Sequence, residues 1–327
     1  MKLLLTAIGK RIQLIEHLKT KFHVVGVDAS LTNPAKDFVD TFRTVPSCSA
    51  ENYVETLLSI CQEEKVDLLI PLYEKEFTTL CDAREDFEKI GTKLILCDKE
   101  VIEACNDKIA TAAFFEKFQI PAPKTYTHEE IENFLKQESE TAVPYPFIMK
   151  PRDGMGSAHV YQIHNKRELE FFYGYVENPM VQELATGEEY TIDALYDLDG
   201  EPVYIVPRLR LEVRSGEVSK SRITNNQKVV DATKQLVEQL KKLGKVVGPM
   251  TLQCFFDEQK EDCIKFIEVN PRFGGGVPLS IQAGADYAGA LQAMCKGEKL
   301  KYTPITKELT MLRYDQAVFE EMSLKFL

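Results

Sequence analysis

The stretch GPMTLQCFFDEQKEDCIKFIEVNPRFGGG, residues 248–276, decides the fold that the rest of the chain must fit. Residues 251–256 and 263–269 are mostly apolar and rich in strand-forming residues, and the polar residues 257–262 separate them. The pattern predicts a β-hairpin that ends in Asn-Pro-Arg and three glycines. Two polar residues are unusual for a purely structural hairpin: Gln253 lies among large apolar residues, and Glu268 ends an apolar run.

The polar residues of this hairpin have the chemistry of a metal site. Glu268 and Asn270 are two residues apart, so their side chains point to the same face of the strand. Carboxylate and amide oxygens suit magnesium, and Gln253 on the neighbouring strand could supply a third oxygen. Arg272 could reach a phosphate, and glycines 274–276 would let backbone N–H groups approach an anion. A solvated strand end is the alternative, but the combination favours a metal and phosphate site.

A second signal lies in residues 147–162, FIMKPRDGMGSAHVYQ. A strand ends near Lys150, a loop contains Gly154, Gly156 and Ser157, and another strand follows. Backbone N–H groups of such a loop can fold over phosphates, and Lys150 would supply a point charge. A P-loop is excluded, because it would read G-x-x-x-x-G-K-[ST] and lead into a helix. The alternative is a hairpin turn with a coincidental lysine.

These two stretches resemble the ATP-grasp superfamily, and within it the ATP-binding unit of carbamoyl phosphate synthase large chains and related carboxylate–amine ligases. The resemblance covers nearly the whole chain and implies an α/β fold. A Rossmann-like domain with a parallel sheet, residues 1–105, would precede the two subdomains of an ATP clamp. These would be a small subdomain with the glycine flap, residues 106–183, and a C-terminal subdomain with the metal hairpin, residues 184–327.

The resemblance also implies ATP and magnesium as cofactors, with manganese as a possible substitute. Glu268 and Asn270 would hold the metal ions that bridge the ATP phosphates, and Gln253 remains the candidate for a third ligand. Arg272 would assist the phosphates or an acyl phosphate intermediate.

Lys108 lies in the first turn of a helix that Asn106 or Asp107 can cap and that Pro121 closes off. A cation at this position opposes the helix dipole, which an anionic partner would explain. The resemblance implies that this partner is an ATP phosphate. The alternative is an ordinary surface lysine.

Residues 179–196 resemble the hinge between the two clamping subdomains. There, the resemblance implies that the backbone around Glu183 and Leu184 would bind the adenine edge, and that Glu189 would bind the ribose hydroxyls. The alternative is a surface loop with several acidic residues.

Residues 203–223 form a basic segment in an acidic protein. Arginine binds phosphate and carboxylate groups bidentately, so a site for both is a better interpretation than nucleic acid. Arg222 is the candidate for the phosphate and, with Arg272, a candidate catalytic residue. Arg208 and Arg210 are candidates for the substrate carboxylate.

Residues 1–105 alternate strand-like and helix-like segments, which predicts a parallel sheet with helices on both faces. Gly9 is the only glycine in the first turn, so the G-x-G-x-x-G dinucleotide motif is absent. Glu74 and Glu76 follow the buried strand that ends at Pro71. They are candidates for a substrate contact, or else belong to a solvated helix N-terminus, where carboxylates are favourable in any case.

The amino-acid composition limits the classes of partner that the protein can bind. The chain has 327 residues and a net charge of −11, with no convincing basic patch of the kind a nucleic-acid-binding protein needs. No apolar run approaches eighteen residues, so we expect no membrane span. The eight cysteines form no C-x-x-C pair, which favours reduced thiols and a cytoplasmic location. We expect small-molecule carboxylate and amine substrates and no nucleic-acid or membrane partner, and a homodimer is the candidate assembly.

The chemistry that the resemblance implies is ATP-dependent formation of a C–N bond through an acyl phosphate. The chain has room for one ATP-grasp unit, whereas the large chain of carbamoyl phosphate synthase has two. A free-standing carboxylate–amine ligase is therefore the favoured interpretation. The alternatives are a subunit of a split carbamoyl phosphate synthase and a non-catalytic ATP-binding regulatory protein.

Overall fold

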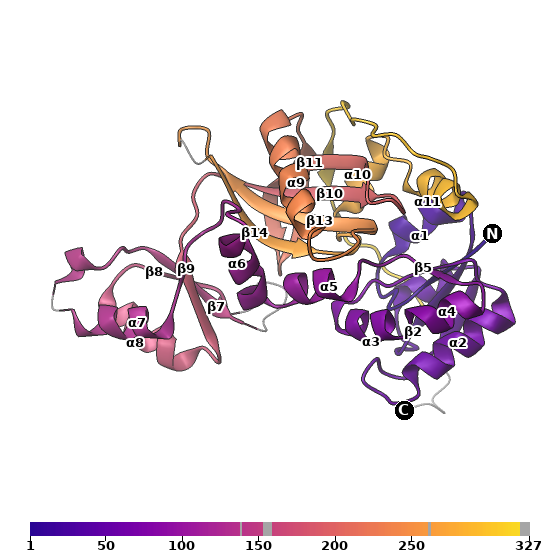
Figure 1. Ribbon diagram of the computed structural model, residues 1–327, viewed down its shortest axis with the longest axis horizontal. Helices are drawn as coiled ribbons and strands as arrows, with labels where there is room; N and C mark the ends of the chain where they lie inside the picture. Colours follow the sequence, from indigo (N-terminus) through magenta and orange to yellow (C-terminus); the bar gives the residue numbers. More distant parts are fainter. Residues whose placement is uncertain (138, 153–158, 261–262, 321–327) are drawn as a thin grey trace.

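Three β-sheets follow one another along the chain. The computed structural model describes residues 1–137, 139–152, 159–260 and 263–320. Figure 1 shows the small second sheet, with its helices, projecting away from the two larger sheets, which lie together with the helices between and around them. The molecule therefore has a broad base and one protruding lobe.

The first sheet is wholly parallel and has the strand order β3-β2-β1-β4-β5, as the alternating pattern predicted. Leu4 of the central strand packs into one hydrophobic cluster, while Leu3 and Leu5 pack into another on the opposite face. Both faces are thus buried, as in α/β proteins generally. Its strands are β1 (Lys2–Leu5), β2 (His23–Asp28), β3 (Thr41–Thr44), β4 (Leu68–Ile70) and β5 (Lys93–Leu94).

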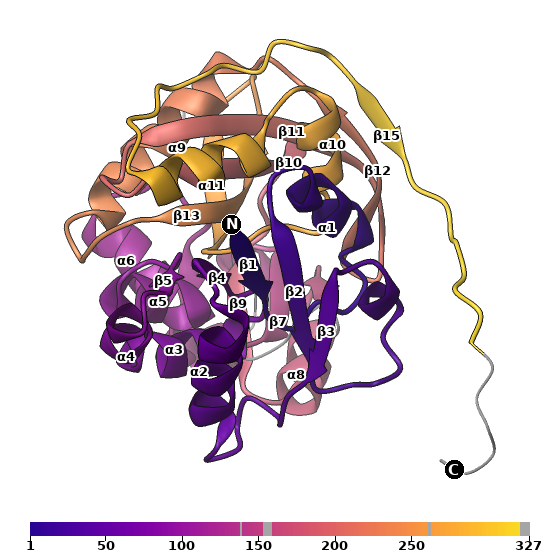
Figure 2. The ribbon, with the colours of Figure 1, turned by 90° about the vertical axis from the view of Figure 1, so that its right-hand side faces the viewer.

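Helices cover both faces of this sheet (Figure 2). Helix α1 packs against the C-terminal helices α10 and α11, so the end of the chain covers part of the first domain. The N-terminal helices are α1 (Ile12–Lys19), η1 (Pro34–Asp37), α2 (Tyr53–Glu64), η2 (Glu74–Glu76), α3 (Phe77–Asp82) and α4 (Arg84–Lys89). The C-terminal ones are α10 (Val277–Gln282) and α11 (Tyr287–Lys296).

Helices α5 (Lys99–Asn106) and α6 (Lys108–Lys117) connect the first domain to the lobe. Asp107 caps α6, because its carboxylate accepts hydrogen bonds from the backbone of Ile109 and Ala110, which confirms one of the two predicted caps.

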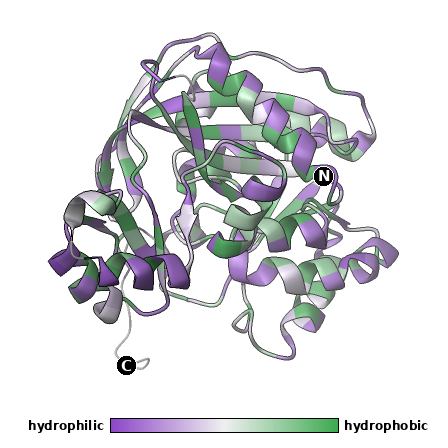
Figure 3. Cartoon of the chain, turned by 60° about the vertical axis from the view of Figure 1, so that its left-hand side comes forward, coloured by the Kyte–Doolittle hydropathy of each residue, from purple (hydrophilic) through white to green (hydrophobic). Residues whose placement is uncertain are grey.

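The protruding lobe is a four-stranded antiparallel sheet of order β6-β9-β7-β8, with its own small core. The predicted loop residues Gly154, Gly156 and Ser157 lie outside the described residues. In Figure 3 the helices are striped with hydrophilic and hydrophobic segments, as amphipathic helices are. The elements are β6 (Thr125–Tyr126), α7 (His128–Lys136), η3 (Glu140–Ala142), β7 (Phe147–Pro151), β8 (Tyr161–Ile163), α8 (Lys166–Tyr175) and β9 (Pro179–Glu183).

The largest sheet has the order β14-β13-β10-β11-β12-β15 and is antiparallel throughout. The predicted hairpin is confirmed as β13 paired with β14, and helix α9 packs on β11. The elements are β10 (Glu188–Tyr196), β11 (Pro202–Arg214), β12 (Glu217–Ile223), α9 (Gln227–Leu240), β13 (Gly248–Phe256), β14 (Ile264–Asn270) and β15 (Thr310–Leu312).

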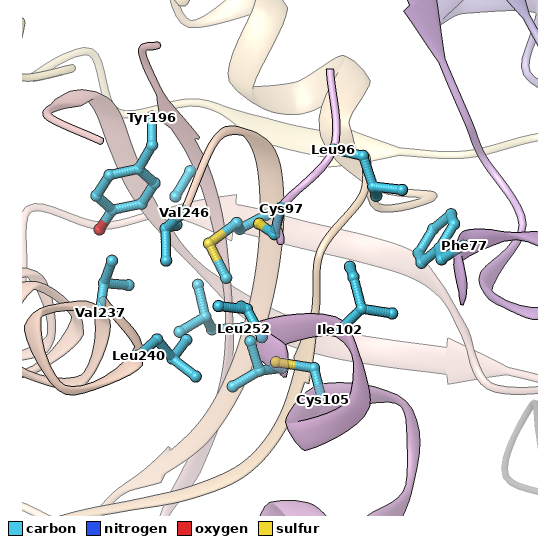
Figure 4. Close-up of a cluster of buried hydrophobic side chains, with 14 of the residues drawn as sticks. Phe77, Leu96, Cys97, Ile102, Cys105, Tyr196, Val237, Leu240, Val246 and Leu252 are labelled. Atoms are coloured by element: carbon cyan, nitrogen blue, oxygen red, sulfur yellow. The ribbon is translucent and has the colours of Figure 1, made fainter. Parts of the chain in front are cut away.

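A single hydrophobic cluster joins the first domain to the largest sheet. Figure 4 shows this cluster, in which Cys97 of the first domain and Cys105 of α5 lie between Leu96 on one side and Leu240 of α9 on the other. Each fully buried side chain of this kind stabilises the fold by roughly 1.5–3 kcal/mol. The first domain and the hairpin are therefore held as one body, and side chains at their junction have fixed neighbours.

The eight cysteines are all free thiols. Burial raises the pKa of Cys97 to about 12, which makes this thiol unreactive. None of the helices in the described residues is both long and apolar enough to cross a membrane.

Candidate functional site

One face of the largest sheet carries a row of polar residues. The register places Thr191 of β10 opposite Arg208 of β11 on one side and opposite Gln253 of β13 on the other. Gln253 in turn stands opposite Glu268 of β14. Directly paired residues share a face, so these four side chains project to the same side of the sheet. The sheet thus lines up a carboxylate, an amide and a guanidinium that are far apart in sequence.

The predicted metal ligands lie together on this face. The Gln253 side-chain nitrogen donates a hydrogen bond of 3.0 Å to Glu268 Oε2, and Asn270 stands opposite Thr251 in the neighbouring pair. Asn270 is only 8% exposed, yet no hydrogen bond of its side-chain amide is found within the described residues. Gln253 orients the carboxylate, and Glu268 and Asn270 present oxygens to the same side.

This donor set fits magnesium. Among the residues that the structure describes, no group of three His, Cys, Asp or Glu side chains gathers to hold a metal ion. A magnesium ion needs no such group, because it binds through one or two protein oxygens and completes its shell with water and phosphates. Glu268 and Asn270 are the residues that would hold it.

Two lysines from other elements approach the same place. Lys150 comes from β7 of the lobe and Lys108 from the first turn of α6. Burial lowers the pKa of Lys150 to about 8, with the nearby Glu268 carboxylate raising it and the Lys108 ammonium lowering it. Lys108 donates a hydrogen bond of 2.9 Å to the Arg152 carbonyl, at the end of β7. The fold therefore concentrates positive charge opposite Glu268.

A pocket lies between the lobe and the hairpin, next to these lysines. Most of its lining residues are apolar, and its polar side chains are two lysines, Gln182 and Thr111. The lining residues are Lys108, Thr111, Ala112, Phe115, Ala122, Pro123, Lys150, Met180, Gln182, Phe266 and Ile267.

The predicted adenine and ribose residues lie beside this pocket or are already paired. Glu183 ends β9, and its carboxylate accepts a hydrogen bond of 2.5 Å from Lys265 of β14. Leu184 follows in the segment that leads to β10. Glu189 of β10 forms an ion pair of 2.8 Å with Arg210 of β11. The strand end at Glu183 is next to Gln182, which lines the pocket, whereas the Glu189 carboxylate is engaged by an arginine.

Arg272 lies at the junction with the first domain. Its Nε donates a hydrogen bond of 2.5 Å to Glu74, and its Nη1 donates one of 3.1 Å to the Phe273 carbonyl. Glu74 is therefore neither a solvated helix terminus nor a free substrate ligand here, because it pairs with the arginine that follows the metal hairpin.

The structure separates the other candidate arginines. Arg208 is 2% exposed and binds Asp193 through two hydrogen bonds of 2.8 and 3.2 Å, so it is a structural residue. Arg222 is exposed and stands opposite Leu209, on the face that Glu268 does not share. This placement does not support the catalytic role predicted for Arg222, because a one-residue offset along a strand turns a side chain to the opposite face.

Glu76 corrects another expectation. It is 1% exposed and accepts hydrogen bonds from Thr6, at 2.5 Å, and from Tyr53. Burial raises the pKa of this carboxyl group, although the hydrogen bonds oppose the rise. Both predictions for Glu76, a substrate contact and a solvated terminus, are wrong because the side chain is enclosed in the first domain.

Sequence reasoning missed Arg11, which reaches the glycine run from the first domain. A Cβ atom built on Gly275 would lie 3.4 Å from Arg11 Nη1 and 3.6 Å from the carboxylate carbon of Glu217. No local pattern marks Arg11, because it is one of two adjacent basic residues in a short loop. Only the packing of the first domain against the hairpin brings it to Gly275.

Comparison with known families agrees with this architecture. Residues 3–95 match the PylC-like N-terminal domain family, and residues 105–276 match the ATP-grasp domain family. The second match covers more than half of the chain. The fold and the site define an ATP-binding clamp behind a parallel-sheet domain, and the chain belongs to the ATP-grasp family, which confirms the resemblance seen in the sequence.

Solved structures of the same fold cover most of the chain. N5-carboxyaminoimidazole synthetase from Staphylococcus aureus, complexed with ADP, has a TM-score of 0.74 and 16% identity over 96% of this chain and 82% of its own. The biotin carboxylase domain dimer of Hydrogenobacter thermophilus 2-oxoglutarate carboxylase was solved in complex with MgADP, ADP and bicarbonate. It has a TM-score of 0.70 and 17% identity over 92% of this chain and 71% of its own.

An L-amino acid ligase from Bacillus licheniformis has a TM-score of 0.65 and 19% identity over 90% of this chain and 74% of its own. At these low sequence identities, the structural similarities show that this chain shares the fold of these proteins. No curated protein sequence matches the chain.

Proposed function

We propose that the protein is an ATP- and magnesium-dependent ligase that activates a carboxylate as an acyl phosphate for attack by an amine. One observation supports this most strongly. The polar row that ends in Glu268 and Asn270 faces the two lysines, Lys108 and Lys150, across the junction of lobe and hairpin. A metal-binding oxygen set opposite two ammonium groups is the arrangement that a triphosphate requires.

Each residue has a distinct role in this proposal. Lys150 and Lys108 neutralise phosphate oxygens, and the apolar pocket beside them takes the adenine ring, with the backbone at Glu183 and Leu184 contacting its edge. Gln253 holds the Glu268 carboxylate in place, and Glu268 and Asn270 hold the cation. Magnesium, when bound, neutralises charge on the phosphates; manganese is a substitute with the same ligand chemistry. Glu189 contacts the ribose hydroxyls in this proposal, and its carboxylate must leave the ion pair with Arg210 to do so.

The reaction needs no nucleophile from the protein. A substrate carboxylate oxygen forms a bond to the γ-phosphorus as the bond to ADP breaks. The amine then forms a bond to the acyl carbon, phosphate leaves, and the amine loses a proton. Arg272, at the end of the metal hairpin, stabilises the transferring phosphoryl group, since charge-assisted hydrogen bonds to phosphate are strong.

A trapping experiment tests this proposal. Protein, Mg-ATP and pools of amino acids are mixed with hydroxylamine, and ADP release and hydroxamate formation are measured by mass spectrometry. Hydroxamate that depends on both ATP and an acid supports an acyl phosphate. ATP binding without ADP release from any pool would favour the non-catalytic regulatory alternative. Carbamoyl phosphate from bicarbonate and ammonia would favour the split synthase.

Two further parts of the proposal concern the state of the protein. We propose a homodimer, which light scattering of the purified chain tests directly. We also propose a cytoplasmic location, which fits eight free thiols and is tested by fractionating cells.

A further inference from the structure

A group of charged residues surrounds Arg11 where the first domain meets the glycine run. Arg11 precedes α1 and follows the loop at the carboxyl end of β1, the edge where open parallel sheets bind ligands. Its guanidinium group approaches Gly275, as the distance of 3.4 Å from a Cβ built there shows. The cations of this cluster, hereafter the Arg11 cluster, are Lys10, Arg11, Arg272 and Arg313, and its carboxylates are Glu74 and Glu217.

The two carboxylates of the Arg11 cluster already have partners. Glu74 accepts a hydrogen bond of 2.5 Å from Arg272. Glu217 lies 3.2 Å from the Lys10 ammonium group and 3.1 Å from Arg313. Four cations therefore face two carboxylates, in a protein whose net charge is −11.

Arg11 is the unpaired cation of the cluster. Within the part of the chain that the structure describes, no side chain or carbonyl accepts a hydrogen bond from its guanidinium group. Burial, followed by repulsion from Arg272, lowers the pKa of Arg11 to about 10, although attraction by the Glu217 and Glu74 carboxylates opposes the shift. An arginine that is half-buried, repelled by a second arginine and without an acceptor is unfavourable in the free protein. An anion between the two guanidinium groups would relieve this.

The position of the cluster relative to the nucleotide site restricts the identity of this anion. Arg272 lies two residues beyond Asn270, so the Arg11 cluster borders the metal end of the hairpin. The lysines that would hold ATP approach from the lobe and α6, whereas Arg11 approaches from the first domain. An anionic group bound to Arg11 would thus meet the phosphate end of the nucleotide from the side opposite to Lys108 and Lys150. Gly275 leaves the space over Arg11 free of a side chain.

We propose that Arg11, together with Arg272, binds the carboxylate substrate through an anionic group, against the backbone of Gly275. This rests on the proposed ligase function and adds a residue and a side of entry for the acid. The surplus of two cations in the cluster favours a substrate with two negative charges, such as a dicarboxylate, over an uncharged one. Arginine pairs with carboxylates bidentately, which also orients the acid.

A binding experiment without turnover tests this inference. Succinate is the anionic probe, and its uncharged diamide is the control ligand at the same concentration and ionic strength. Binding to the full chain is measured by calorimetry and thermal shift in the presence of Mg-ADP. The variants are Arg11→Gln and Arg11→Lys, with Arg167→Gln as a matched control. Arg167 is an exposed arginine on α8 of the lobe.

We expect succinate, but not the diamide, to bind the wild type and Arg167→Gln. Arg11→Gln should weaken succinate binding by roughly tenfold or more, because it removes charge-assisted hydrogen bonds. Arg11→Lys should retain part of the affinity. Arg11→Gln should melt at or above the wild-type temperature, since it removes a repelled cation.

Equal succinate affinity in the wild type and Arg11→Gln, or no succinate binding to either, would overturn the proposal. So would a fall in melting temperature of Arg11→Gln with succinate binding unchanged, which would make Arg11 structural. Mg-ATP binding, measured in parallel, separates this failure from failure of the ligase proposal, because Arg11 touches the acid and leaves nucleotide affinity unchanged.

Discussion

Gln253 of β13 donates a hydrogen bond of 3.0 Å from its side-chain nitrogen to the Glu268 carboxylate, directly across the hairpin. The amide is placed there by strand register, and it binds one oxygen of a carboxylate that lies near enough to Lys150 to raise the pKa of that lysine. A single pairing therefore fixes the orientation of the carboxylate. Because Gln253 is neutral, the full charge of Glu268 remains available for a cation.

Glu268→Gln tests whether this charge serves a metal. The variant keeps the shape of the side chain and can still accept a hydrogen bond from Gln253, but it removes the negative charge. We expect ATP turnover to collapse by about 100-fold or more, as for loss of an electrostatic catalytic group. The melting temperature should stay level or rise slightly, as is common when a functional site loses charge.

One melting curve and one phosphate-release assay decide this case. A lower melting temperature with turnover largely intact would mean that Glu268 is a structural partner of a nearby cation. Gln253→Glu is a matched control, because it places a second carboxylate opposite Glu268. Repulsion should make that variant less stable in the absence of metal, and magnesium should reverse the loss.

The hairpin and its metal ligands could be predicted because their signal is local. Residues 251–256 and 263–269 are rich in strand-forming residues on either side of a polar turn, and the spacing of Glu268 and Asn270 fixes a common face whatever the rest of the chain does. The same holds for Lys150 at the end of β7. The strand β3 was not predicted, since its four residues at a sheet edge are only partly buried and carry no apolar run.

The arginines show what a sequence does not reveal. Arg208, Arg210 and Arg222 look equivalent in one basic segment, yet register turns Arg222 away and buries Arg208 against Asp193. Arg11 has no distinguishing neighbour in sequence and meets Gly275 only through packing of the first domain on the hairpin. Alternation along a strand is predictable once the register is known, but the register of distant strands depends on tertiary contacts.

His17 gives a prediction for acid conditions. Its Nε2 accepts a hydrogen bond of 3.1 Å from the Ala288 amide at the start of α11, which requires the neutral ring. Burial lowers the pKa of His17, with the Asp286 carboxylate opposing the shift. The unfolded chain therefore takes up a proton near pH 6.5 that the folded chain does not, so stability contributed by His17 is present above that pH and falls as the pH is lowered.

Urea denaturation at pH 7 and pH 5 measures this effect. His17→Gln keeps an acceptor but does not titrate, so its stability should change less between the two pH values than that of the wild type. His23→Gln is the control, because His23 is exposed and should leave the wild-type pH dependence unchanged. An equal loss of stability in the wild type and His17→Gln would contradict the role given to His17.

Gly276 packs against the buried arginine. A Cβ atom at Gly276 would lie 2.5 Å from Cζ of Arg208, and hydrogen bonds of 2.8 and 3.2 Å to Asp193 prevent that guanidinium group from moving. Gly276→Ala should therefore lower the free energy of unfolding by roughly 1–3 kcal/mol, as overpacking does. Chemical denaturation measures the loss.

Gly275→Ala is the matched control for this change. The nearest atom to a Cβ there is Arg11 Nη1 at 3.4 Å, an ordinary contact. We expect its stability to stay within about 0.5 kcal/mol of the wild type. Equal destabilisation by both alanines would mean that backbone conformation of the glycine run, not the Arg208 contact, sets the requirement for glycine.

Lys150 links stability, pH and nucleotide affinity. Burial lowers the pKa of this lysine from 10.5 to about 8, which corresponds to a cost of roughly 3 kcal/mol for keeping it charged at neutral pH. Between pH 8 and 10.5 the unfolded chain holds a proton that the folded chain has lost, so this cost is relieved as the pH rises. Lys150→Met should therefore be more stable than the wild type at pH 7, and the difference should shrink toward pH 10.

Nucleotide binding should show the opposite trend. Bound phosphates favour the charged form of Lys150, so Mg-ATP affinity of the wild type should weaken above pH 8, by up to about tenfold per pH unit. Lys150→Met should bind Mg-ATP weakly at every pH, without that dependence, whereas Lys117→Met, at the exposed end of α6, should behave as the wild type does. Calorimetry at pH 7, 8 and 9 provides the measurement. A variant that loses stability at pH 7 while retaining the pH-dependent affinity would show that Lys150 holds the fold and not the phosphates.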